Sequence, residues 1–187
     1  MDILSYILII VLLCTTFYYR RLYLNRSNRD SLTGLYNGTR FTSFLKKKIK
    51  TSRTNSVQFS LILVDIDDFK DLNDTVGYLI ADQYLQKVVR IILDVIGAGE
   101  YVFRQYTRGD EFIVICPNAQ LSYALEISNV LRKKVNEEFL NSDLNLSISC
   151  GVTEHKKEEN YEDLLKRVYV ALREAKSKCN KNTSIGL

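Results

Sequence analysis

The feature that most constrains this chain is an uncharged apolar run near its N-terminus. Residues 3–19 (ILSYILIIVLLCTTFYY) hold no Asp, Glu, Lys or Arg, and 17 residues is the short end of a membrane span. Arg20 and Arg21 can extend towards lipid headgroups, which lets residues 22–24 lengthen the buried stretch. No basic residue precedes the run and no small-residue cleavage site follows it, which argues against a signal peptide. Residues 1–25 are therefore predicted to be a transmembrane anchor, and a buried core helix is the alternative.

The charges around this run predict its orientation. Basic residues follow the apolar stretch and do not precede it, so the preference for positive charge on the cytoplasmic side places residues 20–187 in the cytoplasm. We expect a single-pass protein of the inner, cytoplasmic membrane.

Composition narrows the remaining possibilities. The 187 residues are 46% hydrophobic and 26% charged, which is typical of a globular chain. The net charge of +4 is divided evenly between residues 1–28 and the remainder, so no nucleic-acid partner is expected. The four cysteines form no CxxC pair and His155 is the only histidine, which argues against a zinc site or a Ser-His-Asp enzyme.

Hydrophobic periodicity predicts one α/β domain after a polar linker, with residues 26–38 as linker and domain entry and residues 39–187 as the domain. Helical spacing and strand-like runs alternate along it, which predicts an α+β fold with a mixed central sheet flanked by helices. The expected helices are residues 39–52, 80–96, 121–139 and 161–179, and the expected strands are residues 57–64, 101–106, 112–116 and 146–153.

Two acidic clusters interrupt the apolar strands. Residues 65–68 (DIDD) end a strand that reads as buried on both faces, and Asp110 and Glu111 lie in a predicted hairpin. Crowded carboxylates raise one another's pKa unless a cation neutralises them, and oxygen ligands without His or Cys suit Mg²⁺ or Mn²⁺. Lys70 follows the first cluster and could meet a phosphate. Solvated turns are the simpler interpretation of each cluster alone; the two together favour a metal–phosphate site.

Four blocks of sequence resemble the GGDEF family of diguanylate cyclases. They lie in the family's order and at sensible spacing, within about residues 29–182. The blocks are residues 29–41 (RDSLTGLYNGTRF), residues 65–82 (DIDDFKDLNDTVGYLIAD), residues 108–112 (RGDEF) and residues 171–176 (ALREAK).

The resemblance implies a palm-type nucleotidyl cyclase fold and the condensation of two GTP to cyclic di-GMP with release of pyrophosphate. Each of two facing domains would hold one GTP, so a homodimer is expected, with two Mg²⁺ or Mn²⁺ ions per half-site. By similarity, Asp65 and Asp110 would bind the metals by carboxylate and Ile66 by its backbone carbonyl. Glu111 would help to hold metal or to deprotonate the 3′-hydroxyl.

The same resemblance assigns the substrate contacts. Lys70 and Lys176 match the lysines that bind the triphosphate, and the backbone N–H groups of Asp68, Phe69 and Lys70 would surround the β- and γ-phosphates.

Asn73 and Asp82 match the pair that recognises guanine. A carboxylate can accept hydrogen bonds from both N1–H and the exocyclic amine of guanine, whereas adenine has no donor at N1, so Asp82 favours GTP. An Asx turn at Asn73 and a favourable charge at a helix start at Asp82 are the structural alternatives.

The chain departs from the family at Arg108, which replaces the first glycine of the signature. Its guanidinium must point away from the nucleotide, intrude on the site or become a new substrate contact. Two alternatives to the cyclase therefore stay open. One is a catalytically silent domain that binds nucleotide or a protein, and the other is a related cyclic-oligonucleotide synthase, resembling the minimal CRISPR-polymerase-like enzymes, that uses other nucleotides.

Overall fold

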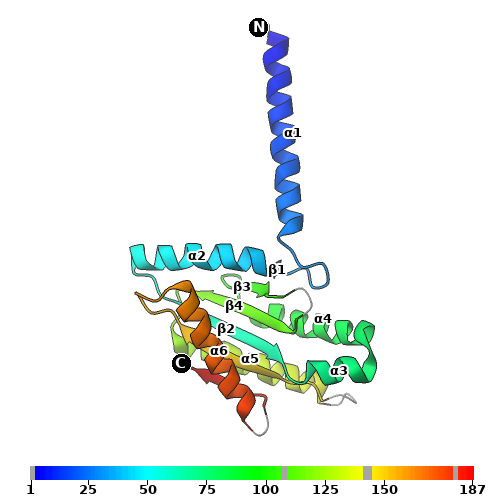
Figure 1. The fold of residues 1–187 in the computed structure, drawn as a ribbon, viewed down its shortest axis with the longest axis vertical. Helices are drawn as coiled ribbons and strands as arrows, with labels where there is room; N and C mark the ends of the chain where they lie inside the picture. The colour runs from blue at the N-terminus through cyan, green and yellow to red at the C-terminus, as the bar shows by residue number, and fades with distance from the viewer. Residues whose placement is uncertain (1–2, 107–108, 141–144, 179–180) are drawn as a thin grey trace.

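The globular part of the chain is built around a mixed six-stranded sheet. A computed structural model describes residues 3–106, 109–140, 145–178 and 181–187. The strand order is β1-β3-β4-β2-β5-β6, with β1–β3 and β5–β6 parallel and the other pairs antiparallel (Figure 1). The strands are β1 (Tyr36–Asn37), β2 (Phe59–Ile66), β3 (Tyr101–Arg104), β4 (Glu111–Pro117), β5 (Ile148–Glu154) and β6 (Ser184–Gly186). The helices are α1 (Ile3–Ser27), α2 (Gly38–Asn55), α3 (Phe69–Val76), α4 (Tyr78–Val95), α5 (Leu121–Phe139) and α6 (Tyr161–Ser177).

Strand β2 lies in the middle of the sheet because both of its faces are apolar. All eight of its residues are buried. Successive side chains of a strand point to opposite faces, so Leu61 and Leu63 pack on one side while Ile62 and Val64 pack on the other. Two cores result, one beneath α2 and α6 and the other beneath α4 and α5. The predicted mixed sheet flanked by helices is confirmed.

The elements that the periodicity did not predict are short. Helix α3 has eight residues, and its N-cap Asp68 has a φ of 54°, in the left-handed region. Strands β1 and β6 have two and three residues, too few for an alternating pattern. The expected linker is also more structured than predicted, since α1 continues to Ser27 and β1 pairs with β3.

Several predicted boundaries shift by a few residues. Strand β2 runs to Ile66 and so includes Asp65, which was expected to follow the strand. Strand β3 ends at Arg104, two residues earlier than predicted. Helix α5 has the predicted bounds.

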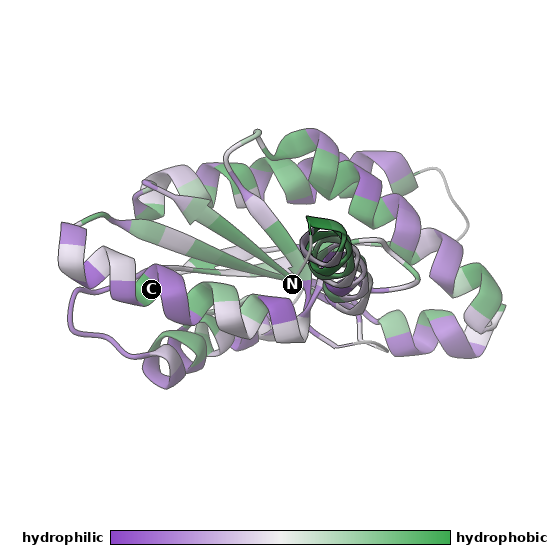
Figure 2. Cartoon of the chain, turned by 90° about the horizontal axis from the view of Figure 1, so that it is seen from above, coloured by the Kyte–Doolittle hydropathy of each residue, from purple (hydrophilic) through white to green (hydrophobic). Residues whose placement is uncertain are grey.

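Helix α1 projects away from the sheet, and Figure 2, which views the chain along this helix, shows its hydrophobic colouring. The 22 residues Ile3–Leu24 have the length and composition of a membrane span, and none of the span is buried inside the structure. At 1.5 Å per residue they cover about 33 Å, close to the thickness of a hydrocarbon core of about 30 Å.

Gly151 allows α6 to approach the sheet closely. A Cβ at this position of β5 would lie 2.4 Å from the Leu172 nitrogen and 2.4 Å from the Val168 carbonyl oxygen, both of the α6 backbone. We predict that Gly151→Ala lowers the free energy of unfolding by about 1–3 kcal/mol, because backbone cannot yield as a side chain can. Denaturant unfolding measures this. Gly99→Ala is the control, since no atom lies within 4 Å of the added Cβ; equal losses in both variants would contradict the prediction.

Candidate active site

Three carboxylates gather where β2 and β4 meet the same edge of the sheet. Asp65 and Glu111 are register partners on these antiparallel strands, and Asp110 immediately precedes β4. Asp65 is only 6% exposed because it still belongs to the buried strand. We call Asp65, Asp110 and Glu111 the acidic edge. The structure therefore brings together the two clusters that the sequence placed 45 residues apart.

Helix α6 supplies a cation to the acidic edge. Lys176, in its last turn, forms an ion pair with Oδ1 of Asp65. This oxygen is buried, so the Lys176 ammonium contacts it away from solvent. The sequence analysis assigned Lys176 to the triphosphate; in the structure Lys176 contacts Asp65, a predicted metal ligand.

Burial and mutual repulsion perturb all three carboxyl groups. Burial raises the pKa of Asp65 from 3.8 to about 7; the Asp110 and Glu111 charges add to the rise, and Lys176 opposes it. The pKa values of Asp110 and Glu111 are also raised, chiefly by burial. Ionisation of all three carboxyl groups costs free energy at this site, and a bound cation would offset that cost.

Tyr169 orients one of the carboxylates. Its hydroxyl donates to Oε2 of Glu111 at 2.9 Å, from α6, two helical turns before Lys176. Burial and the neighbouring Glu111 charge both raise the pKa of Tyr169, so it remains a donor. The sequence analysis missed this residue; its seven-residue spacing from Lys176, which places both on one helix face, was the available clue.

A buried arginine positions the backbone before Asp110. The Arg104 guanidinium donates to the Gly109 carbonyl oxygen from Nε at 3.1 Å and from Nη2 at 2.9 Å. Its Nη1 pairs with Oδ1 of Asp30 at 2.9 Å, and both side chains are at most 3% exposed. Burial opposes the charge on Asp30, but hydrogen bonds from Thr33 and Arg104 hold its pKa below the ordinary value. Asp30 comes from the segment after α1, so this contact ties the domain entry to the signature.

The loop after β2 is held by the C-terminal segment. The Asp67 carboxylate accepts hydrogen bonds from Ser147 Oγ at 2.6 Å, Ser149 Oγ at 2.8 Å and the Asn182 backbone N–H at 3.2 Å. Lys181 forms an ion pair with the exposed Asp68. These contacts join residues that are 80 or more positions apart, so no local sequence pattern predicts them.

The remaining predicted substrate residues lie around α3 and the start of α4. Asp68 caps α3, Phe69 is buried in the core, and Lys70 is exposed in the first turn. The Asn73 side-chain amide donates to the Phe69 carbonyl oxygen at 2.9 Å, and Asp82 is half-buried in the first turns of α4.

Two further predicted residues complete the comparison. Ile66 is the last residue of β2, next to Asp65, and its side chain is fully buried. Arg108, the departure from the family signature, lies outside the described residues.

The donor set at the acidic edge fits a hard divalent cation. Carboxylate oxygens of Asp65 and Asp110 and the backbone carbonyl of Ile66 are the ligand types that Mg²⁺ and Mn²⁺ accept. The raised pKa values of Asp65 and Asp110 agree with this chemistry. Within the described ranges, no group of three or more acidic, histidine or cysteine side chains forms a ready-made cage, so substrate oxygens or water would complete the coordination.

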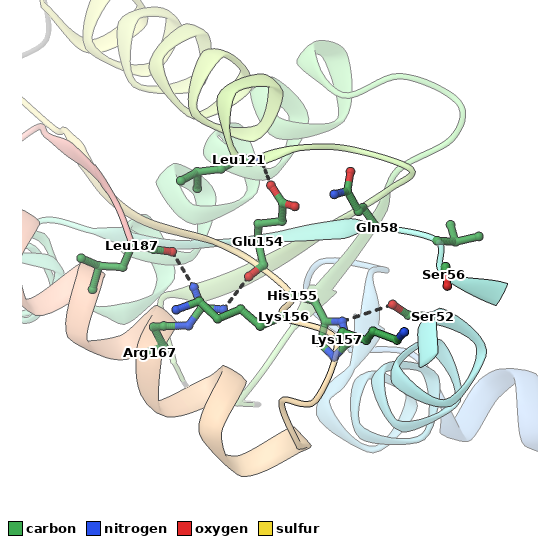
Figure 3. A pocket seen from close by; sticks show the side chains of 11 residues that line it. Ser52, Ser56, Gln58, Leu121, Glu154, His155, Lys156, Lys157, Arg167 and Leu187 are labelled. Carbon is green, nitrogen blue, oxygen red and sulfur yellow. Dashed lines mark hydrogen bonds between the residues drawn. The ribbon is translucent and has the colours of Figure 1, made fainter. Parts of the chain in front are cut away.

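A cavity of about 580 Å³ lies at the other end of β2 and β5 (Figure 3). Glu154, which lines it, accepts from the Leu121 N–H at 2.8 Å, and Arg167 donates to the Leu187 carbonyl oxygen at 2.6 Å. The His155 ring is bonded to the Ser52 hydroxyl at 3.2 Å. These polar groups are already hydrogen-bonded within the protein. The acidic edge, and not this cavity, is therefore the candidate active site.

With the fold and the geometry of the acidic edge described, the sequence comparison identifies the family of the chain. Residues 27–182 match the family described as "Diguanylate cyclase, GGDEF domain". The chain belongs to the GGDEF family, which confirms the resemblance noted in the sequence.

Two curated relatives illustrate the relationship. Diguanylate cyclase DosC of Escherichia coli is 29% identical over 157 residues, which cover 80% of this chain and 34% of DosC. Response regulator PleD of Caulobacter vibrioides is 32% identical over 163 residues, covering 84% of this chain and 35% of PleD. The chain thus spans about a third of the length of each relative.

Solved structures support the fold. The coiled coil and GGDEF domain of DgcB from Caulobacter crescentus, in complex with c-di-GMP, superposes with a TM-score of 0.82 at 24% identity, covering 96% of this chain and 99% of that one. Diguanylate cyclase SiaD from Pseudomonas aeruginosa, in complex with its activator SiaC, gives a TM-score of 0.80 at 25% identity, covering 98% and 73%.

The ion pair with Lys176 predicts a titration shift. In Lys176→Met, the pKa of Asp65 should rise above its value of about 7, because the opposing cation is lost while burial and the Asp110 charge remain. Carboxyl-carbon NMR titration of the metal-free protein measures it. Lys181→Met, which removes the cation paired with Asp68, should leave the Asp65 titration unchanged. An Asp65 pKa that falls in Lys176→Met would contradict the assignment.

Proposed function

We propose that the chain is a membrane-anchored diguanylate cyclase that condenses two GTP to cyclic di-GMP. The convergence of Asp65, Asp110 and Glu111 with Lys176 on one sheet edge, in a GGDEF-family chain, carries this proposal. In the reaction, the 3′-oxygen of each GTP attacks the α-phosphorus of the other. The bond to pyrophosphate breaks, so two GTP yield one cyclic di-GMP and two pyrophosphates.

Each residue of the acidic edge would have its own role in this reaction. Asp65 and Asp110, with the Ile66 carbonyl, would hold Mg²⁺ or Mn²⁺, two ions per half-site. Bound cations of this kind lower the pKa of a hydroxyl and neutralise charge that develops on phosphate. Glu111, whose pKa is raised and whose carboxylate is oriented by Tyr169, is placed to accept the proton of the 3′-hydroxyl or to help hold metal.

Other residues position the substrate. Lys70 and Lys176 would bind the triphosphate, with the backbone N–H groups of Asp68, Phe69 and Lys70 around its outer phosphates. If Asp65 holds a metal ion, the Lys176 ammonium would leave its ion pair with Asp65 and could contact phosphate.

Asn73 on α3 and Asp82 on α4 would recognise guanine, and both side chains are half-buried.

Catalysis between two half-sites requires two domains face to face. A homodimer would bring one GTP from each chain into contact. Helix α1, inserted in the cytoplasmic membrane with the domain on the cytoplasmic side, would raise the local concentration of the domains and so favour pairing.

The proposal predicts the effect of removing one carboxylate. Asp110→Asn should lower the rate of cyclic di-GMP formation from GTP and Mg²⁺ by at least about 100-fold, because charge on the α-phosphate loses its stabilisation. Product analysis by mass spectrometry measures this in the full chain in lipid. Asp94→Asn, an exposed acid on α4, is the matched control and should be neutral. Undiminished turnover in Asp110→Asn would reject the mechanism, and GTP binding without turnover in the unaltered chain would reject the cyclase itself.

The guanine assignment predicts a change of specificity. Asp82→Ala should lower kcat/KM for GTP by about 5- to 150-fold. The reason is that a carboxylate that accepts hydrogen bonds from two donors of a base contributes about 1–3 kcal/mol. The ratio of kcat/KM for GTP to kcat/KM for ATP should fall by the same factor in this variant. Mixed-nucleotide assays measure both values, with Asp74→Ala, an exposed acid of α3, as control. An unchanged GTP/ATP ratio in Asp82→Ala would remove this residue from the base site.

A further inference from the structure

The outward face of α2 is strongly basic. The helix buries Phe41, Leu45, Ile49 and Ser52 against the sheet. Its 18 residues include six Lys or Arg and no Asp or Glu. The cations that are exposed on the side away from the buried residues form what we call the basic face: Arg40, Lys46, Lys47 and Lys50.

This face is turned towards the side of the domain from which α1 projects. In Figure 1, α2 runs across the domain beneath the end of α1, with the sheet on its other side. The basic face would therefore point towards the surface of a bilayer crossed by α1. Lys48 does not belong to this face, because it is half-buried and its ammonium lies 6.0 Å from the centroid of the Phe59 ring. Lys46 is exposed, although its ammonium lies 5.2 Å from the centroid of the Tyr161 ring.

A cavity connects the two helices. It has a volume of about 460 Å³ and lies between the last turns of α1 and the start of α2. Arg20, Arg21 and Arg40 line it together with Tyr36, and the Arg40 guanidinium lies 5.7 Å from the centroid of the Tyr36 ring. Phe17 and Leu24 add apolar surface to the same cavity. Cations beside apolar side chains suit a group that joins an anionic head to an acyl chain.

Charge is distributed unevenly along the chain. Residues 1–55 contain 10 of the 26 basic and 2 of the 22 acidic side chains, a balance of +8, which leaves −4 on residues 56–187. The positive part comprises α1, α2 and the segment between them. The remainder, which includes the acidic edge, would be repelled by an anionic surface, so the field orients the domain.

We propose that the basic face of α2 and the cavity at the end of α1 bind the headgroups of anionic phospholipids. The inference rests on the proposed membrane anchoring by α1. Lipid is favoured over nucleic acid because the cations lie on the one side where α1 would place a bilayer. Binding holds α2 along the membrane surface and sets the orientation of the catalytic domain, a task that the single helix α1 cannot perform alone.

The experiment uses the absence of tryptophan from the sequence. Ser43→Trp, on the exposed side of α2, gives the full chain a single fluorophore, and Ser122→Trp on α5 is the matched control on the opposite face of the sheet. Both are reconstituted in vesicles that carry a headgroup spin-labelled quencher. The lipid is phosphatidylcholine alone or mixed with phosphatidylglycerol.

Ser43→Trp should be quenched in the mixed vesicles and not in phosphatidylcholine alone, and Ser122→Trp in neither. The quenching should be lost when salt rises from about 0.1 M to about 1 M, since the screening length falls from about 10 Å to about 3 Å. Lys47→Gln with Lys50→Gln should also abolish it. Lys133→Gln with Lys134→Gln, an exposed pair on α5, should not. Equal quenching at both tryptophans, or quenching that ignores phosphatidylglycerol, would overturn the proposal.

Failure of the anchor is detected separately. An alkaline wash of phosphatidylcholine vesicles reports insertion of α1, which does not depend on anionic lipid. Release in the wash would reject the anchor and the inference together. Retention with no Ser43→Trp quenching in mixed vesicles would reject the inference and leave the proposed anchoring in place.

Discussion

The burial of three neighbouring carboxyl groups, Asp65, Asp110 and Glu111, is the constraint on which the rest of the structure depends. These carboxyl groups are crowded at the end of buried strands, and burial raises the pKa of each. Their charges are tolerated because Lys176 lies among them at the end of α6. The close approach of α6 to β5 at Gly151 is therefore part of the site, since the packing of the helix sets the position of the lysine.

A second set of contacts joins the acidic edge to the way the chain enters the domain. Asp30 follows α1 and pairs with the buried Arg104, which in turn holds the Gly109 carbonyl next to Asp110. Removing one partner of a buried ion pair costs several kcal/mol of stability, because the other charge is left buried without a partner. A displacement of the entry segment would therefore be transmitted through Asp30 and Arg104 to the backbone at Gly109.

Positive and negative charge are concentrated in different parts of the chain. Residues 1–55, which include the proposed anchor, are positive and the rest of the chain is negative, and the acidic edge belongs to the negative part. Negative potential would favour the proposed binding of Mg²⁺ or Mn²⁺, whereas positive potential would favour the proposed contact with anionic headgroups. One small domain could serve both proposed roles because α2 covers one face of the sheet while the carboxylates lie at the ends of strands.

The sequence by itself determined what depends on neighbouring residues: the apolar run of α1, the long helices from their periodicity, the buried strand β2 and the family from its four motifs. Only the tertiary structure decided that Asp65 faces Glu111, that Tyr169 orients Glu111, that Arg104 rather than a residue nearer the signature supports Gly109, and that Lys181 reaches Asp68. These contacts join segments whose proximity arises from strand pairing and helix packing. Local periodicity carries no information about such pairing, and strands as short as β1 and β6 exist only because a longer partner is already in place.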